Sequence, residues 1–249
     1  MKAILLVAGY ATRLFPLTKD RPKALLEFWG KPILTYIFEN MCKIKEIDEV
    51  FVVSNNRFYP HFQEWANGLQ TDVKVNVIND GTNSDDDKLG AVGDLHLVLE
   101  QHAFEDDFMV LVGDNLFTYE LKDFYDFHRK VDGDCICTAY LDSKEELQRM
   151  GVVLLDENGR VTEFAEKPKE PKSNLAAYGA YIYKNDTLPL IRQYVTEGNN
   201  MDAPGNLPAW LCQKKPVYAF VFEGACFDIG TVKSYHEVMD TCKELFVKD

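Results

Sequence analysis

Short apolar runs alternate with amphipathic segments through the first half of the chain. Each run has about the length of a strand, and each is followed by a stretch with helical spacing of apolar residues. Such alternation is typical of βαβ units, whose strands pair in parallel. The runs that predict strands are Ala3–Val7, Glu49–Ser54, Val73–Ile78 and Phe108–Val112.

Helical spacing is clearest after Pro32, a residue that suits the first turn of a helix because no backbone donor is needed there. Two further helices are predicted, from Gly90 to about Gln101 and over Asp123–Arg129. The side chains expected to face the sheet are Ile33, Leu34, Ile37, Phe38 and Met41 in the first helix and Leu95, Val98 and Leu99 in the second.

The second half of the chain carries antiparallel signals. Asn158 and Gly159 tolerate the positive φ angles of a tight turn, so the apolar segments on either side predict a hairpin. Four prolines are interpreted as marking connections between elements. The predicted strands are Gly151–Leu155, Arg160–Ala165, Ala177–Tyr183 and Val217–Phe222, the final helix runs from Val232 to Phe246, and the prolines are Pro168, Pro171, Pro204 and Pro208.

Composition and charge narrow the class of protein. The 249 residues include 46% hydrophobic and 27% charged residues, which is ordinary for a globular enzyme. A net charge of -13 disfavours binding to nucleic acid or to anionic membranes, because both require a cationic surface. The apolar start is too short for a membrane span and lacks a signal cleavage pattern. Six cysteines without a CxxC pair favour a reducing cytoplasm over a zinc site or a disulfide scaffold.

The segment that follows the first predicted strand has the chemistry of a phosphate site. Residues 8–14 read AGYATRL, and residues 21–26 read RPKALL. Small residues at the carboxyl end of a strand let backbone N–H groups approach a polyphosphate, while Arg13 and Lys23 can neutralise its charge. Arginine grips two phosphate oxygens through its planar fork, and lysine supplies a compact charge.

This opening resembles the signature AGxGTRLxPLTxxxPKxLL of the nucleoside-diphosphate-sugar pyrophosphorylases, also called sugar-1-phosphate nucleotidylyltransferases. The resemblance implies nucleotide binding by Ala8, Gly9, Ala11 and Thr12, and catalytic roles for Arg13 and Lys23. Ala11 stands where the family usually has glycine. Its methyl group is accommodated if the local φ is negative, and otherwise crowds the phosphates or strains the turn.

Two aspartates are candidate metal ligands. Asp114 follows a buried strand, at the end where open α/β sheets place ligands, and Asp228 lies beside a glycine turn and a predicted helix start. Alone, either could belong to a plain turn or could cap a helix. The family has a GDN-like motif and a later DxGT motif, and the resemblance therefore assigns both aspartates to Mg²⁺, which prefers oxygen donors.

The resemblance also implies an acceptor site and a base-reading segment. Residues 163–168 (EFAEKP) are similar to the family's ExKP segment, in which Glu166 would bind acceptor hydroxyls and Lys167 the acceptor phosphate. Gly151 and Gly179 resemble glycines of the acceptor pocket. Residues 79–94 resemble a variant of the family's LGTAGAL-type segment, and the candidates for nucleotide contact there are Asp80, Thr82 and Gly90.

Together these signals predict an α/β fold with a Rossmann-like, mixed but mainly parallel central sheet flanked by helices, and a smaller antiparallel lobe that binds the acceptor. One nucleotidyltransferase domain is expected over 1–249, with a nucleotide-binding part at about 1–135, an acceptor-binding part at about 136–230 and a C-terminal helix at 231–249. The expected substrates are a nucleoside triphosphate and a sugar 1-phosphate, which places the chain in nucleotide sugar biosynthesis.

Several alternatives stay open at this stage. Bacterial choline-phosphate cytidylyltransferases share the opening signature, so choline phosphate is a rival acceptor, recognised by an aromatic and acidic cage. A noncatalytic nucleotide-binding relative is a further alternative if Ala11 blocks the loop. A glycosyltransferase would require a DxD motif at a strand end, and Gly113-Asp114-Asn115 does not provide one. The family's frequent self-association makes a homo-oligomer an expectation.

Overall fold

The chain, described by a computed structural model over residues 1–247, groups into two compact units. One, the loop unit, consists of Leu5–Lys88, Val112–Lys122 and the described chain from Gly224 onward. The other, the hairpin unit, consists of Met1–Ile4, Leu89–Leu111 and Asp123–Glu223. Residues 248 and 249, predicted to end the C-terminal helix, lie outside the described part.

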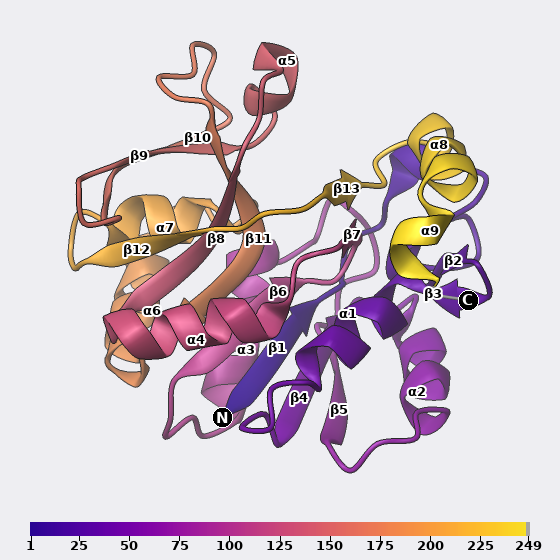
Figure 1. Ribbon diagram of the computed structural model, residues 1–249. Coiled ribbons are helices and arrows are strands. Elements are labelled where there is room, and N and C mark those ends of the chain that lie inside the picture. The colour runs from indigo at the N-terminus through magenta and orange to yellow at the C-terminus, as the bar shows by residue number, and fades with distance from the viewer. Residues whose placement is uncertain (248–249) are drawn as a thin grey trace. The chain divides into compact units, whose positions relative to one another are not determined.

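The loop unit contains the parallel strands predicted from the first half of the chain. Strand β4 (Glu49–Ser54) pairs in parallel with β5 (Lys74–Asn79), and the end of β1 (Lys2–Leu6) lies next to β4. Helices α1 (Ile33–Met41) and α2 (Tyr59–Asn67) flank these strands (Figure 1). All five apolar side chains predicted to face the sheet from α1 are buried, as the helical spacing requires.

Two small antiparallel sheets complete the loop unit. Strands β2 (Glu27–Phe28) and β3 (Lys31–Pro32) form one, and β7 (Asn115–Phe117) and β13 (Cys226–Asp228) form the other. The remaining elements of this unit are the short 3-10 helices η1 (Thr12–Leu14) and η2 (Lys23–Leu25) and the helices α8 (Val232–Thr241) and α9 (Lys243–Phe246).

The hairpin unit is built around β11 (Leu175–Tyr183). This strand pairs antiparallel with β6 (Phe108–Val112), β8 (Asp134–Tyr140) and β9 (Gly151–Leu155). The hairpin predicted from sequence joins β9 to β10 (Val161–Glu166), and β12 (Val217–Val221) pairs in parallel with β8. Its helical elements are α3 (Ala91–Gln101), α4 (Leu121–Val131), α5 (Lys144–Leu147), η3 (Asn185–Thr187), α6 (Leu188–Thr196) and α7 (Asn206–Leu211).

These elements give the predicted fold class, a mixed α/β fold with a mainly parallel central sheet flanked by helices and small antiparallel sheets. Leu95, Val98 and Leu99 of α3 are buried, as predicted. Strands β1 and β6 are divided between the two units, because the division falls after Ile4 and after Leu111.

Three local predictions need correction. The final helix is broken at Cys242, whose φ of -112° and ψ of 7° lie outside the helical region, so α8 and α9 are separate. In the hairpin turn Gly159 has a positive φ of 77° and Asn158 does not, because the Asp156 carboxylate binds the backbone N–H groups of Asn158 and Arg160. Pro208 lies inside α7 rather than in a connection, within the first turn, where its missing donor leaves no helical hydrogen bond unmade.

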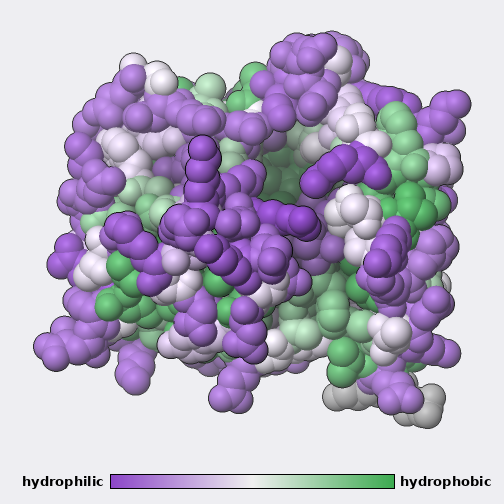
Figure 2. Space-filling model, turned by 90° about the horizontal axis from the view of Figure 1, so that it is seen from above, coloured by the Kyte–Doolittle hydropathy of each residue, from purple (hydrophilic) through white to green (hydrophobic). Residues whose placement is uncertain are grey.

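The surface agrees with the acidic composition. The face seen in Figure 2 is mainly hydrophilic, and the hydrophobic residues on it form separate patches. Large hydrophobic side chains that are exposed in the described chain include Phe15, Tyr140, Val221 and Leu245. No helix among residues 1–247 is both long and apolar enough to cross a membrane.

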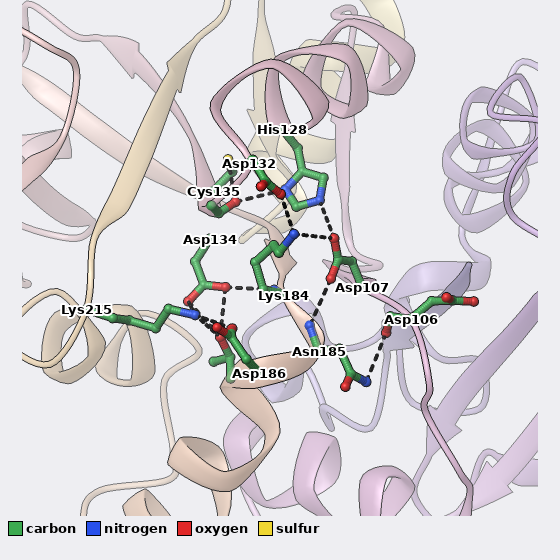
Figure 3. Close-up of polar contacts among 12 residues, drawn as sticks. Asp106, Asp107, His128, Asp132, Asp134, Cys135, Lys184, Asn185, Asp186 and Lys215 are labelled. Carbon is green, nitrogen blue, oxygen red and sulfur yellow. Dashed lines mark hydrogen bonds and ion pairs between the residues drawn. The ribbon is translucent and has the colours of Figure 1, made fainter.

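A network of charged side chains in the hairpin unit includes none of the predicted site residues (Figure 3). Asp107 accepts hydrogen bonds from His128 Nε2 at 3.1 Å and from the backbone N–H of Asn185 at 2.9 Å, and Lys184 Nζ lies 3.3 Å from its carboxylate. A neighbouring set joins Asp134, which is fully buried, to Thr187 and to Lys215. The set around Asp134 connects the start of β8 to the segment after β11, and the set around Asp107 connects that segment to α4.

His128 contacts an oxygen atom through each of its ring nitrogens in this network. Its side chain is buried, and its Nδ1 lies 2.9 Å from the carbonyl oxygen of Gly133, which can only accept. Its Nε2 faces the Asp107 carboxylate. Burial acts to raise the pKa of Asp107, but the Asn185 N–H, His128 and Lys184 outweigh it and hold that pKa below its usual range. Asp107 is therefore an ionised acceptor at neutral pH, and it contacts the buried imidazole of His128.

Replacing Asp107 with asparagine should destabilise the protein by about 2 to 3 kcal/mol at neutral pH, the usual effect of losing hydrogen bonds to a charged group. The wild-type carboxyl has a folded pKa below its unfolded value of about 3.9. Its stabilisation is thus complete above about pH 4 and is lost as pH falls through the lower folded value. Urea unfolding at several pH values should show the two proteins converging in acid. The exposed neighbour Asp106 provides the control, and Asp106→Asn should unfold like wild type.

Candidate active site

The phosphate loop predicted from sequence begins where β1 ends. The backbone N–H of Val7 donates to the carbonyl of Val53 in β4, and the side-chain amide of Asn55 donates to the carbonyl of Ala8 at 2.8 Å. Asn55 is buried, and its Oδ1 accepts from the backbone N–H of Phe58 just before α2. One amide side chain therefore ties the loop to the start of a helix.

Ala11 adopts the left-handed conformation, with φ of 47° and ψ of 43°. The local φ is thus positive, the case in which a side chain at this position is strained. The carbonyl of Ala11 accepts from the buried hydroxyl of Thr18 at 2.8 Å and from the backbone N–H of Leu14 at 3.0 Å. At Gly9, by contrast, a Cβ would meet no atom within 4 Å, so the backbone there faces open space.

Thr12 and Arg13 lie in η1, directly after the strained residue. The Arg13 side chain is exposed, as required of a group that reaches a bound anion. Lys23 is different, because its side chain in η2 is buried, with 8% of the residue exposed. Of the two residues predicted to be catalytic, Arg13 is thus exposed and Lys23 is buried.

The buried ammonium of Lys23 lies between the two predicted metal-binding carboxylates. Its Nζ donates to Asp114 Oδ2 at 2.9 Å and to Asp228 Oδ1 at 3.2 Å. Burial acts to lower the pKa of Lys23, but Asp114 and Asp228 together outweigh it and raise that pKa above its ordinary value. Lys23 is therefore a fixed positive charge that two carboxylates share.

The small sheet of β7 and β13 explains how the two aspartates meet. Asp114 immediately precedes β7 and Asp228 ends β13, and the antiparallel register sets Asp228 opposite Asn115. The backbone N–H of Thr118 extends this pairing by donating to the carbonyl of Ala225 at 2.9 Å. Residues far apart in sequence are thereby brought within reach of one lysine nitrogen.

Glycine is required just before Asp114 because two strands approach closely there. A Cβ at Gly113 would lie 2.4 Å from a methyl carbon of Val7 and 3.0 Å from one of Leu34. The backbone N–H of Gly113 also donates to the carbonyl of Leu6 at 3.1 Å. The position of Asp114 is therefore set by the packing of Gly113 against the end of β1 and against α1.

The oxygen donors around Lys23 could also hold a hard cation. Besides the two carboxylates, the buried Oδ1 of Asn115 has no hydrogen-bond partner among residues 1–247. An orphaned buried acceptor is uncommon in a folded protein. Within the same residues, no group of three or more His, Cys, Asp or Glu side chains has the arrangement of a metal site. Any bound ion would thus take part of its coordination from a ligand or from water.

Two predicted nucleotide contacts, Asp80 and Thr82, bind each other. The Asp80 carboxylate accepts from the backbone N–H of Thr82 at 2.7 Å and from its hydroxyl at 2.8 Å. Because that hydroxyl hydrogen is used by Asp80, the Tyr10 hydroxyl is the donor in the 3.3 Å contact with Thr82 Oγ1. Tyr10 and Thr82 are both buried, so this chain of hydrogen bonds connects the phosphate loop to the segment after β5.

Gly90 belongs to the hairpin unit, whereas the other residues predicted to contact the nucleotide belong to the loop unit. Its φ is +80°, and a Cβ there would lie 2.4 Å from the carbonyl oxygen of Met201. The next two backbone N–H groups, of Ala91 and Val92, donate to the carbonyls of Asp202 and Met201 at 3.0 Å. The first turn of α3 is therefore capped by backbone from the 201–202 segment.

The predicted acceptor residues lie in the hairpin unit. Gly151 begins β9 opposite Glu166 at the end of β10, and Gly179 lies in β11, where the pairing with β8 shifts register. Burial raises the pKa of Glu166, against the opposing effect of Lys167. The Lys167 ammonium lies 4.0 Å from Glu166 Oε1, and its backbone has a positive φ of 49° that turns the chain after β10.

Sequence reasoning missed several residues that support this site. Asn55 is a polar residue directly after a predicted strand, and that placement is a signal which could have identified it. Thr18 and Asn115 stand within the quoted motifs but were assigned no role, because the contact of Thr18 with the Ala11 carbonyl and the unpaired Oδ1 of Asn115 are seen only in the fold. Gly205, which packs against Glu166, was also missed.

Replacing Ala11 with glycine should stabilise the protein by about 0.5 to 1 kcal/mol, because glycine adopts the left-handed conformation without a Cβ clash. The gain is smaller than the full strain, since glycine also increases the entropy of the unfolded chain. The denaturation midpoint in urea, compared at equal slope, measures the change. A loss of stability would show that the methyl group packs favourably and is not strained.

Comparison with known proteins places these observations in a family. A family model described as nucleotidyl transferase matches residues 2–244. A glucose-1-phosphate adenylyltransferase of Mycoplasma mobile is 29% identical over 252 residues, covering 95% of this chain. The UTP–glucose-1-phosphate uridylyltransferase AglF of Haloferax volcanii is 32% identical over 185 residues, covering 74% of this chain and 72% of its own. This chain spans 65% of the length of the Mycoplasma protein.

A solved structure shares the fold. The crystal structure of a UDP-glucose pyrophosphorylase complexed with UDP-glucose superposes with a TM-score of 0.81 at 20% identity, covering 98% of each chain. The resemblance predicted from the opening motif is confirmed by a family match over nearly the whole sequence. With that match and with the two distant aspartates gathered on one lysine, the chain belongs to the nucleotidyl transferase family.

Proposed function

We propose that this protein transfers a nucleoside monophosphate from a nucleoside triphosphate to a sugar 1-phosphate, giving a nucleoside-diphosphate sugar and pyrophosphate. One observation carries the proposal, the contact of Lys23 Nζ with both Asp114 and Asp228. These three side chains come from three separate motifs of the sequence. A site for a metal-bound triphosphate requires carboxylates for the metal and a cation for the phosphates close together, and these three side chains meet that requirement.

The proposed reaction needs charge more than it needs a base. The phosphate of the acceptor is already an anionic nucleophile, so it can attack the α-phosphorus without losing a proton to the protein. Pyrophosphate leaves with the electrons of the broken P–O bond. The work of the protein is to position the reactants and to neutralise developing charge, and Arg13, Lys23 and Lys167 are the cations assigned to it.

Magnesium is part of the proposal, and the donor set fits it. Lys23 occupies a point between two carboxylates where a positive charge is held, and Asn115 offers an unused buried oxygen nearby in sequence. Asp114 and Asp228 would hold the ion, whose coordination magnesium usually completes with water and substrate phosphate oxygens. When bound, magnesium supplies positive charge to the triphosphate.

The acceptor is proposed to be a sugar phosphate for two reasons. The relatives named above are a glucose-1-phosphate adenylyltransferase and a glucose-1-phosphate uridylyltransferase. In the hairpin unit, Glu166 combines a desolvated carboxylate with an adjacent lysine, which suits hydroxyl groups and a phosphate. The names of these relatives give no support to choline phosphate as the acceptor.

Asp114→Asn and Asp228→Asn should each lower kcat/KM by about 10²-fold or more, the usual loss when one electrostatic contact to the reacting phosphates is removed. Each change removes one of the two negative charges that would hold the ion. Kinetics at increasing Mg²⁺ should show a higher magnesium requirement in both variants. Asp240→Asn, at an exposed position of α8, is the matched control. Wild-type magnesium dependence in both site variants would refute the assignment.

The two exposed cations should separate kinetically. Lys167→Ala is expected to raise KM for the acceptor by about 10 to 100-fold, the range for a lost charged hydrogen bond, with little change in KM for the triphosphate. Arg13→Ala should instead impair use of the triphosphate. Steady-state kinetics with each substrate varied in turn measures both effects, and the opposite pattern would exchange the two roles.

A matrix of four nucleoside triphosphates against several sugar 1-phosphates and phosphocholine tests the function itself. Pyrophosphate release and the mass of the product identify the base and the acceptor together. We expect turnover with at least one sugar phosphate and none with phosphocholine. Triphosphate binding without turnover of any acceptor would instead indicate a noncatalytic nucleotide-binding protein.

A further inference from the structure

The backbone conformation at Gly205 does not require glycine. It directly precedes α7, and its φ of -68° and ψ of -16° are ordinary helical values that any residue adopts. The conformational freedom of glycine is therefore unused at this position. The reason for glycine at this position must therefore be steric.

The space that a side chain at Gly205 would fill is occupied by the side chain of Glu166. A Cβ built on Gly205 would lie 2.1 Å from Glu166 Oε2, 3.0 Å from Glu166 Cδ and 3.2 Å from Phe164 Cζ. A second glycine faces the same pair, since a Cβ on Gly151 would lie 2.6 Å from Phe164 Cζ and 3.2 Å from Glu166 Oε2. Two glycines from different elements thus leave room for one carboxylate.

The backbone at Gly205 is held by the helix that follows it. The carbonyl of Gly205 accepts from the backbone N–H of Ala209 at 3.1 Å, which starts the helical hydrogen bonding of α7. Leu207 and Leu211 of α7 are buried against the unit. A side chain added at Gly205 would therefore displace the flexible end of Glu166 rather than the backbone.

We propose that Gly205 is a positioning residue, which fixes the Glu166 carboxylate in the place where it receives hydrogen bonds from hydroxyl groups of the acceptor. The inference rests on the proposed function for its role in acceptor binding. Its structural part, the seating of Glu166 by the absent side chain of Gly205, is independent of that function. The residue acts through Glu166 and does not itself touch the acceptor.

The structural part is tested without any substrate. Burial raises the pKa of Glu166, so a carboxylate displaced toward water should titrate closer to the ordinary value of about 4.3. Carboxyl ¹³C NMR titration of Gly205→Ala should show this decrease, with the Glu166 signal assigned by its loss in Glu166→Gln. An unchanged Glu166 titration in Gly205→Ala would overturn the inference, whatever the activity of the enzyme.

The functional part is tested by kinetics. Gly205→Ala should raise KM for the acceptor about tenfold and leave KM for the triphosphate within about twofold, the equivalent of one weakened hydrogen bond. In a Glu166→Ala background the same substitution should have almost no further effect, because no carboxylate is left to displace. Gly68→Ala is the control, since Gly68 has no positive φ and its Cβ would approach no atom closer than 3.5 Å.

The outcomes separate the inference from the proposed function. A lowered Glu166 pKa with an unchanged acceptor KM would overturn the role in acceptor binding. Additive effects of Gly205→Ala and Glu166→Ala would overturn it as well, because the two residues would then act independently. If wild type uses no acceptor at all, the proposed function fails, while the NMR titration still decides whether Gly205 seats Glu166.

Discussion

The shared ion pair of Lys23 with Asp114 and Asp228 is the interaction on which the candidate site depends. A buried ammonium is costly unless carboxylates compensate it, and two nearby carboxylates repel each other unless a cation lies between them. Each charge therefore stabilises the others, and the raised pKa of Lys23 reflects the attraction of the two carboxylates. The same arrangement keeps the two carboxylates together in the absence of substrate, as the proposed site for a cation and a triphosphate requires.

Around this ion pair, the loop unit holds its phosphate loop through side chains that contact backbone carbonyls. Asn55 binds the carbonyl of Ala8, and Thr18 binds that of Ala11. These two buried groups account for the persistence of a left-handed alanine, because strain at one residue survives only when its surroundings determine the conformation. In the proposed function, a loop fixed in this way presents its backbone to the triphosphate without a large entropic cost on binding.

In the hairpin unit, a carboxylate is held in place by the space that two glycines leave. Gly151 and Gly205 leave room for Glu166, and burial in that space perturbs the carboxylate that the proposed function assigns to acceptor hydroxyls. Elsewhere in the unit, the contact of the buried His128 with the half-buried Asp107 connects α4 to the segment before β6. One polar group of this unit is thus available to a ligand in the proposal, while the other is satisfied internally and contributes to stability.

The sequence alone was enough to predict the family, and the strands and helices of the first half, and it singled out Lys23, Asp114 and Asp228, which the fold brings together. These features are local, because hydrophobic period and motif order are properties of neighbouring residues. From the sequence it also follows that Ala11 is strained if its φ is positive. Only the tertiary structure decided that this φ is positive, since Thr18 and Asn55 act from other segments. Likewise, the position of Lys23 between the aspartates depends on the pairing of β7 with β13, and the reason for Gly205 depends on Glu166. Contacts between residues far apart in sequence leave no local pattern, so the packing of the folded chain determines them.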